Sequence, residues 1–181
     1  MQAPSGQTTA AAMLTDGDLV GEWVLDPRNS SIRLKTRSMW GLAPVKGVFR
    51  EVSGNGTISS DGQVSGTVTV AAASIDTKNA RRDTHLRSAD FFDVANNPDI
   101  TFAADLIRPS GQGVAVAGAL TVRGRTRPLS FDAAASVQGD GGIWLDAEIR
   151  INRADFGLTW NPMGLVGVNN TLAIHAVFTR R

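Results

Sequence analysis

The sequence predicts an all-β protein in which antiparallel strands form one closed barrel. Apolar and polar residues alternate with period two through most of the chain after Trp23, which is typical of strands that bury one face and expose the other. Turn signals such as Asn55-Gly56 and Asp61-Gly62 separate the alternating segments and favour hairpins. No segment has the spacing of a βαβ unit, so the sheet should be antiparallel. Closure into a barrel would hide the sheet edges, although a β-sandwich fits the same pattern.

The alternation and the turns together place about eight strands and a further one near the end of the chain. Their expected ranges are 22–28, 30–37, 44–59, 63–76, 99–108, 114–123, 126–138, 143–153 and 171–180. In the last strand Leu172 and Ile174 share one face, which puts His175 on the opposite, outward face. Gly66 and Gly118 occupy the same offset in two similar strands, and we interpret each as a point where a strongly coiled sheet bends.

Residues 79–89 interrupt the alternation and predict a short helix. The stretch is mostly polar and contains good helix formers, with Asn79 in position to cap the first turn. Leu86 would supply an apolar contact before Phe91 and Phe92 return the chain to an extended form. We expect this helix to lie across one end of the barrel as a lid or plug.

Length, composition and charge indicate a single soluble domain. The chain has 181 residues, of which 42% are hydrophobic, enough for one sizeable core at residues 21–181 after a flexible N-terminal extension at 1–20. The formal net charge of +1 gives no global field toward nucleic acid. No run approaches the roughly 20 apolar residues that span a bilayer. No signal peptide is visible, so we expect a cytoplasmic protein, or a periplasmic or secreted one if the N-terminus is incomplete.

The residues that could carry chemistry form no recognisable catalytic or metal-binding pattern. The chain contains no Cys and two His, His85 and His175, so thiolate chemistry is excluded and a zinc site lacks most of its usual donors. Asp83 and His85 are too close in sequence to share a helical face, and the G-x-S-x-G elbow of a serine nucleophile is missing. We therefore expect no catalytic residues, no metal site and no cofactor.

Several motifs, taken in order, resemble those of one known family. They are Trp23-x-Leu25-Asp26-Pro27, Val45-Lys46-Gly47-x-Phe49, Arg82-Asp83-x-His85-Leu86-Arg87-Ser88-x-Asp90-Phe91-Phe92-Asp93 and Asn152-Arg153-x-Asp155-Phe156-Gly157. In this succession the chain resembles the YceI-like family over nearly everything after residue 21. The resemblance implies a lipocalin-like antiparallel β-barrel, often dimeric, whose lumen takes a long apolar chain such as a polyprenoid, an isoprenoid quinone or a fatty amide. We therefore expect a lipocalin-like barrel of about eight strands with a short helix near residues 79–89.

The predicted ligand site is the lumen of this barrel. Its apolar wall is predicted to include Leu34, Met39, Trp40, Phe49, Phe91, Phe102, Leu120, Phe131, Ile149 and Trp160. Contacts to a polar head group are predicted for Arg82, His85 and Arg153. Many family members carry a His shortly after the second strand, where this chain has Ser38-Met39-Trp40, so we expect a more apolar mouth. Small residues such as Ala133 leave room for a ligand, whereas a barrel of this size can also be filled by its own side chains.

The resulting hypothesis is non-enzymatic carriage or storage of a long-chain isoprenoid or similar amphipathic lipid, by a protein that could form a homodimer. Burial of apolar surface, at roughly 25 cal/mol per Å², would supply the affinity. One alternative is an enzyme acting on an apolar substrate, with His85 and Asp83 or Asp90 as acid-base groups. A second alternative is a ligand-free structural or stress-response module that acts through protein contacts.

Overall fold

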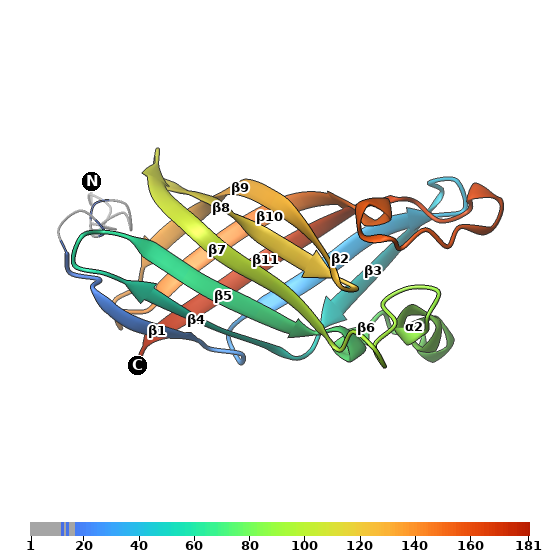
Figure 1. Ribbon diagram of the computed structural model, residues 1–181, viewed down its shortest axis with the longest axis horizontal. Helices are drawn as coiled ribbons and strands as arrows, with labels where there is room; N and C mark the ends of the chain where they lie inside the picture. Colours follow the sequence, from blue (N-terminus) through green and yellow to red (C-terminus); the bar gives the residue numbers. More distant parts are fainter. Residues whose placement is uncertain (1–11, 13, 15–16) are drawn as a thin grey trace, which may run out of the picture.

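Antiparallel pairing joins eleven strands into one sheet within the part of the chain that the structure describes, residues 12, 14 and 17–181 (Figure 1). The computed structural model has strands β1 Gly21–Leu25, β2 Ser31–Ser38, β3 Ala43–Phe49, β4 Val52–Ile58, β5 Val64–Ala71, β6 Ile75–Asp76, β7 Asp99–Ser110, β8 Gly113–Val122, β9 Arg125–Val137, β10 Ile143–Asn152 and β11 Asn169–Arg180. The helix α2 spans Ala80–Arg87, and 3₁₀ turns lie at η1 Ala72–Ser74, η2 Arg153–Phe156 and η3 Pro162–Gly164.

The strand β11 closes the sheet into a barrel because it pairs with three other strands. Its last residues pair with β1, where Phe178 lies opposite Leu25, and its first residues pair with β2, where Thr171 lies opposite Lys35. It also pairs with β10 along the whole length of that strand. Among the described residues the closed ring is β1-β4-β5-β7-β8-β9-β10-β11, which has eight strands. The predicted eight-stranded antiparallel barrel is therefore confirmed, and the pairing of β1 with β11 excludes an open sandwich.

Residues 44–59 and 63–76, each expected as one strand, are both interrupted. The interruptions face each other, since residues 50–51 separate β3 from β4 and the turn η1 separates β5 from β6. The backbone N–H of Arg50 donates to the carbonyl of Ser74 across the break at 3.1 Å. The two facing breaks differ in length, so the sheet bends here. The buried residues Phe49 and Val52 are three positions apart, an interruption of the period of two that the expected range 44–59 ignored.

Gly118 in β8 lies opposite a bulge in β7. The register of these two strands shifts between Ala104 and Leu106, and a Cβ atom on Gly118 would collide with the carbonyl of Ala103. A glycine permits this close approach of two backbones because it has no side chain. The position agrees with the sequence-based interpretation of Gly118 as a bend in a coiled sheet.

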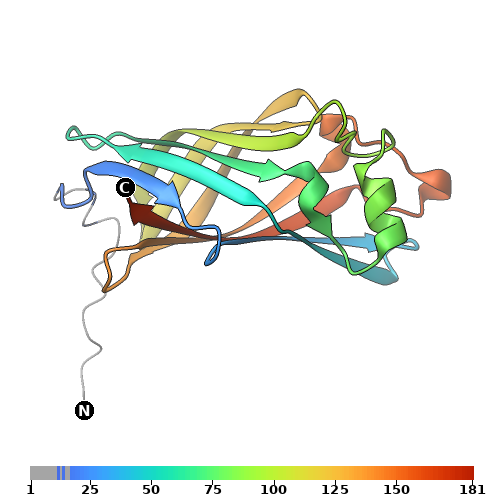
Figure 2. The same ribbon diagram turned by 90° about the horizontal axis from the view of Figure 1, so that it is seen from below.

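The helix α2 lies across one end of the barrel, away from the end that carries the C-terminus (Figure 2). Asn79 caps it, since its side-chain oxygen accepts a hydrogen bond from the Arg82 N–H at 3.0 Å. Leu86 packs against the apolar clusters that contain Phe49 and Phe91. The predicted short helix and its cap are therefore confirmed, but Phe91 and Phe92 lie in turns and the chain becomes extended only at Asp99.

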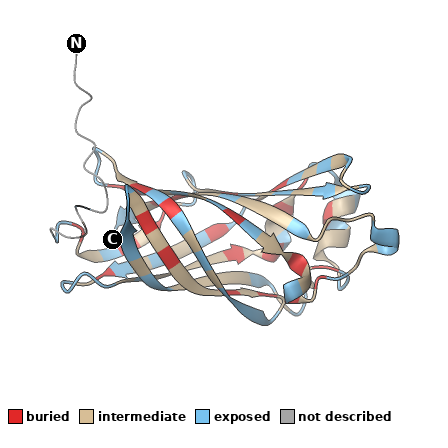
Figure 3. Cartoon of the chain, turned by 90° about the horizontal axis from the view of Figure 1, so that it is seen from above, coloured by how far each residue is buried: buried red, intermediate tan, exposed pale blue. Residues whose placement is uncertain are grey.

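The opposite end of the barrel is closed by its own side chains. Leu19, Trp23, Ile58 and Ile143 form a buried cluster, and the Trp23 indole N–H donates to the carbonyl of Leu19 at 3.0 Å. Most of the predicted extension at 1–20 lies outside the described residues, but Leu19 belongs to this core. Along the barrel, buried residues alternate with more exposed ones (Figure 3), as a sheet with one inward face requires.

Candidate functional site

An apolar cavity of about 820 Å³ occupies the interior of the barrel. Its wall extends from Leu19 and Trp23 at the closed end to His85 and Trp160 at the end covered by α2. The alternation along each strand supplies this wall, because every second side chain points inward. The volume lies within the range of roughly 300–1,000 Å³ that is typical of small-molecule sites.

The cavity wall contains eight of the ten apolar residues predicted to line the lumen. They are Leu34, Phe49, Phe91, Phe102, Leu120, Phe131, Ile149 and Trp160. The three predicted polar residues, Arg82, His85 and Arg153, also line it. The small side chains of Ala133 and Ala135 face the same space, so the barrel is not filled by its own side chains.

Met39 and Trp40 lie outside the cavity wall, which differs from the prediction. The strand β2 ends at Ser38, and both residues adopt left-handed backbone conformations with φ of 53° and 54°. They turn outward in the connection to β3, where they are 56% and 70% exposed. The inward assignment rested only on the position of these two residues just after the second strand, and beyond a strand end no alternation fixes the direction of a side chain.

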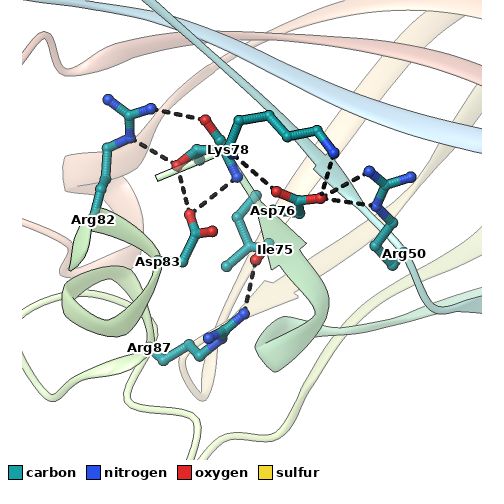
Figure 4. A network of polar contacts seen from close by, with 8 residues as sticks. Arg50, Ile75, Asp76, Lys78, Arg82, Asp83 and Arg87 are labelled. Atoms are coloured by element: carbon teal, nitrogen blue, oxygen red, sulfur yellow. Dashed lines mark hydrogen bonds and ion pairs between the residues drawn. The ribbon is translucent and has the colours of Figure 1, made fainter. Parts of the chain in front are cut away.

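A polar network fixes α2 to the segment that precedes it (Figure 4). Thr77 donates its backbone N–H and its hydroxyl to the buried Asp83 carboxylate at 3.0 and 2.5 Å. Arg82 Nε donates to the Thr77 hydroxyl at 2.8 Å, and Arg82 Nη2 donates to the Thr77 carbonyl at 2.9 Å. Arg87 Nη2 donates to the carbonyl of Ile75 at 3.0 Å. These charged side chains therefore hold the helix in place over the barrel end.

Asp76 forms a partly exposed ion-pair cluster beside this network. Arg50 Nη2 lies 2.7 Å and Lys78 Nζ lies 3.2 Å from its carboxylate (Figure 4). The hydrogen bond from Arg50, followed by those from the backbone and side chain of Lys78, holds the pKa of Asp76 well below its ordinary value. Asp76 is therefore ionised near neutral pH and links the break between β3 and β4 to the start of α2.

His85, in the last turn of α2, contacts the segment that follows η2. Its Nε2 is 2.8 Å from the carboxylate of Asp90. Its ring meets the Trp160 ring edge-to-face with centroids 4.4 Å apart, and meets the Phe91 ring in the same way at 5.3 Å. The imidazole is thus a partly exposed polar group within an aromatic cluster, and its carboxylate neighbour is Asp90 and not Asp83.

Arg153 is a buried cation in the cavity wall. Its guanidinium donates to the carbonyls of Gly167, Leu158 and Val166 and lies 5.5 Å from the centroid of the Phe91 ring. Within the described part of the chain it pairs with no carboxylate. Burial lowers the pKa of Arg153, although a guanidinium keeps its proton in proteins. Arg153 therefore organises the segment between η2 and β11 and adds positive potential to the cavity.

The sequence-based site omitted several wall residues. Val114 in β8 and Leu145 in β10 line the cavity, and their alternation with outward residues was a usable signal. Leu158 and Val166 also line it, but they belong to an irregular segment. Hydrogen bonds to Arg153 set the path of that segment, so no periodicity in the sequence marked these two residues.

Asp83→Ala is expected to destabilise the protein by about 2 kcal/mol, because the substitution leaves the buried N–H and hydroxyl of Thr77 without their acceptor. Thr84→Ala, at an exposed position of the same helix, should change the free energy of unfolding by less than about 0.5 kcal/mol. Denaturant unfolding measures both values, and hydrogen exchange should show faster exchange in α2 of the Asp83 variant. Equal effects of the two substitutions would contradict a role for this network in holding the helix.

The fold and the cavity together define a class of protein, the lipocalin-type antiparallel β-barrels with an apolar interior. A family model described as the YceI-like domain matches residues 23–178. The chain therefore belongs to the YceI-like family, and the resemblance of its motifs to that family is confirmed. None of the helices in the described residues combines the length and the apolar character that crossing a membrane demands.

Relatives agree with this assignment, and solved structures agree with the fold. A UPF0312 protein of Serratia proteamaculans is 33% identical over 165 residues, which are 85% of each chain. Protein YceI of Salmonella arizonae is 32% identical over 163 residues, again 85% of each chain. BcnA of Burkholderia cenocepacia superposes with a TM-score of 0.77 over 84% of this chain and 98% of that chain, at 21% identity. A polyisoprenoid binding domain from Saccharophagus degradans superposes with a TM-score of 0.72 over 88% and 98%, at 14% identity.

Proposed function

We propose that this protein binds a long-chain isoprenoid or a similar amphipathic lipid in its barrel and carries or stores it without transforming it. The observation that carries the proposal is the cavity of about 820 Å³, whose wall is formed mainly by apolar side chains from all parts of the barrel. Removal of apolar surface from water is the main source of affinity for such a ligand. Membership of the YceI-like family and the fold shared with a polyisoprenoid binding domain support the same ligand class.

The lipid tail is proposed to lie along the barrel and the head group to lie under α2. Three groups there differ from the apolar wall, namely the guanidinium groups of Arg82 and Arg153 and the imidazole of His85. Both arginines already donate to backbone carbonyls and keep further N–H donors. These donors and their charge favour a head group that accepts hydrogen bonds, such as a hydroxyl, a quinone carbonyl, an amide or a phosphate.

Catalysis by His85 and Asp83 receives little support from the geometry. The Asp83 carboxylate accepts from Thr77, whereas His85 lies beside Asp90. An acid-base pair would therefore have to be His85 and Asp90, at the partly exposed surface of the cavity mouth. His85→Ala tests this second candidate, since loss of a measured turnover with lipid binding retained would replace the carrier function by an enzymatic one.

Mass spectrometry of organic extracts from the purified native protein tests the proposal directly. We expect a long-chain isoprenoid or related lipid in about equimolar amount, since one chain fills one small lumen. Protein stripped of lipid should then bind an added polyprenol, ubiquinone or fatty amide. Absence of lipid in the extract together with absence of binding to all three probes would contradict the proposal and favour a ligand-free structural module.

A further inference from the structure

The connection between β2 and β3 carries a group of large apolar side chains that are exposed to solvent. Trp40 is 70% exposed and Leu42 is 82% exposed. Met163 in η3 is 82% exposed. We call these residues and Met39 the apolar tip. A protein usually buries side chains of this size, and several together at one place are typical of an interaction site.

The two segments that form the apolar tip are joined to each other. The N–H of Gly167 donates to the carbonyl of Arg37 at 2.8 Å, and Ser38 forms an isolated bridge with Val166. A Cβ atom on Gly164 would lie 4.0 Å from Nε1 of Trp40. Both segments project from the barrel end that carries α2 (Figure 1). The residues of the apolar tip therefore come from two neighbouring segments at the same end of the barrel.

The strands below the apolar tip are strongly basic. Arg33, Lys35, Arg37 and Lys46 are all exposed, and we call these four residues the basic stem. No Asp or Glu occurs between residues 31 and 50, and no described residue forms an ion pair with any member of the basic stem. Lys35 lies directly opposite Lys46, an arrangement in which like charges repel. A chain with a net charge of only +1 thus concentrates unpaired cations on one hairpin.

We propose that the apolar tip and the basic stem dock this protein onto an anionic lipid bilayer. Tryptophan, leucine and methionine side chains partition into the boundary between head groups and acyl chains. Lysine and arginine side chains behind them are attracted to anionic head groups. The combination of exposed apolar residues with adjacent cations fits such a surface on both counts, and the inference stands on the hairpin itself, whatever occupies the barrel.

A second copy of the chain fits this surface less well than a bilayer. A two-fold contact through the apolar tip would use the same patch on both subunits. It would therefore bring the two basic stems toward each other, and no acidic residue of the hairpin would compensate their repulsion. An anionic bilayer offers opposite charge instead.

Docking in this orientation would bring the cavity mouth to the membrane surface. Ser38 and Val166, which bridge the two segments of the apolar tip, also line the cavity. A lipid tail moving between bilayer and barrel would then cross little water, which is the costly part of its path. The surface thus supplies a route of exchange that the cavity alone does not specify.

Co-sedimentation with vesicles tests the proposal, using the full chain stripped of bound lipid. The vesicles are phosphatidylcholine alone or phosphatidylcholine mixed with phosphatidylglycerol. We expect binding to the mixed vesicles only, with a steep loss at high salt. The tip variant, Met39→Ser with Trp40→Ser and Leu42→Ser, should lower the partition coefficient by about tenfold or more. Lys35→Glu with Lys46→Glu, made separately, should do the same.

Matched controls separate these effects from general loss of apolar surface or charge. Trp144→Ser removes an exposed tryptophan from the outer face of β10, and Arg28→Glu with Arg108→Glu makes the same change of charge outside the hairpin. Both should leave partition within about twofold of the parent.

Failure of the parent protein to bind mixed vesicles, or equal binding by the tip variant, would overturn the proposal. A dimer that dissociates in the tip variant, without vesicle binding by the parent, would overturn it in favour of a second copy. Lipid binding by the stripped protein, measured separately, reports on the cavity alone.

Discussion

Replacing Ala133 by tryptophan is expected to lower the affinity for an isoprenoid probe by about 100-fold while the barrel stays folded. Ala133 faces the cavity, so the new indole would occupy space that the lipid tail needs. Exclusion of roughly 100 Å² of apolar contact at about 25 cal/mol per Å² corresponds to about 2.5 kcal/mol, close to two decades in Kd. Titration of lipid-stripped protein with a labelled polyprenol measures the change.

Ala134→Trp is the matched control for this experiment. Ala134 is the next residue of β9 and is exposed on the outer face of the barrel. The same substitution there should leave the affinity within a factor of about two, because it does not enter the lumen. Thermal unfolding of both variants shows whether the barrel is intact. Unchanged affinity in the folded Ala133 variant would mean that the ligand does not occupy the middle of the cavity.

Arg153→Met is expected to lower the free energy of unfolding by about 3 kcal/mol. The substitution leaves the carbonyls of Leu158, Val166 and Gly167 without the donors that they now have, and each buried acceptor without a partner costs about 1–3 kcal/mol. Relief of the desolvation of a buried cation offsets part of this loss. Denaturant unfolding gives the net change, and hydrogen exchange should show that residues 157–168 open first.

Arg150→Met provides the comparison for Arg153. Arg150 lies on the same stretch of chain, in β10, but its side chain is exposed. Its replacement should change the free energy of unfolding by less than about 0.5 kcal/mol. If Arg153→Met proved as mild as Arg150→Met, the three carbonyls must find other donors, and Arg153 would not be the group that organises the mouth of the cavity.

The fold could be predicted because its main physical signal is local. In a strand such as β10, Leu145 and Ala147 face inward while Asp146 and Glu148 are exposed, so the alternation of apolar and charged residues can be read in the sequence. The helix α2 was equally visible, through Asn79 and a polar stretch. The breaks between β3 and β4 and between β5 and β6 were missed. Arg50 and Glu51 interrupt the alternation at the first break, but the backbone hydrogen bond from Arg50 to Ser74 that spans the two breaks joins residues far apart in the sequence.

The candidate site was predictable to the extent that strands build it. Wall residues such as Leu34 and Phe102 follow from the alternation of their strands. Met39 and Trp40 do not, because the chain leaves the strand at Ser38 and turns them outward. The exposure of Met39 and Trp40 is also the observation that suggests membrane docking. The alternation of the strands predicts the cavity wall, but it does not predict this exposed surface.

The pairing of β11 also constrains the order in which the barrel can form during synthesis. β11 is the partner of β1 and β2 as well as of β10, so the ring stays open until residues 169–180 have left the ribosome. Until then the edges of β1 and β2 and the inward apolar face are exposed, and an unpaired edge invites association with other chains. Contacts that join positions so distant in sequence also form slowly. We therefore expect the nascent chain to be most prone to aggregation before β11 emerges.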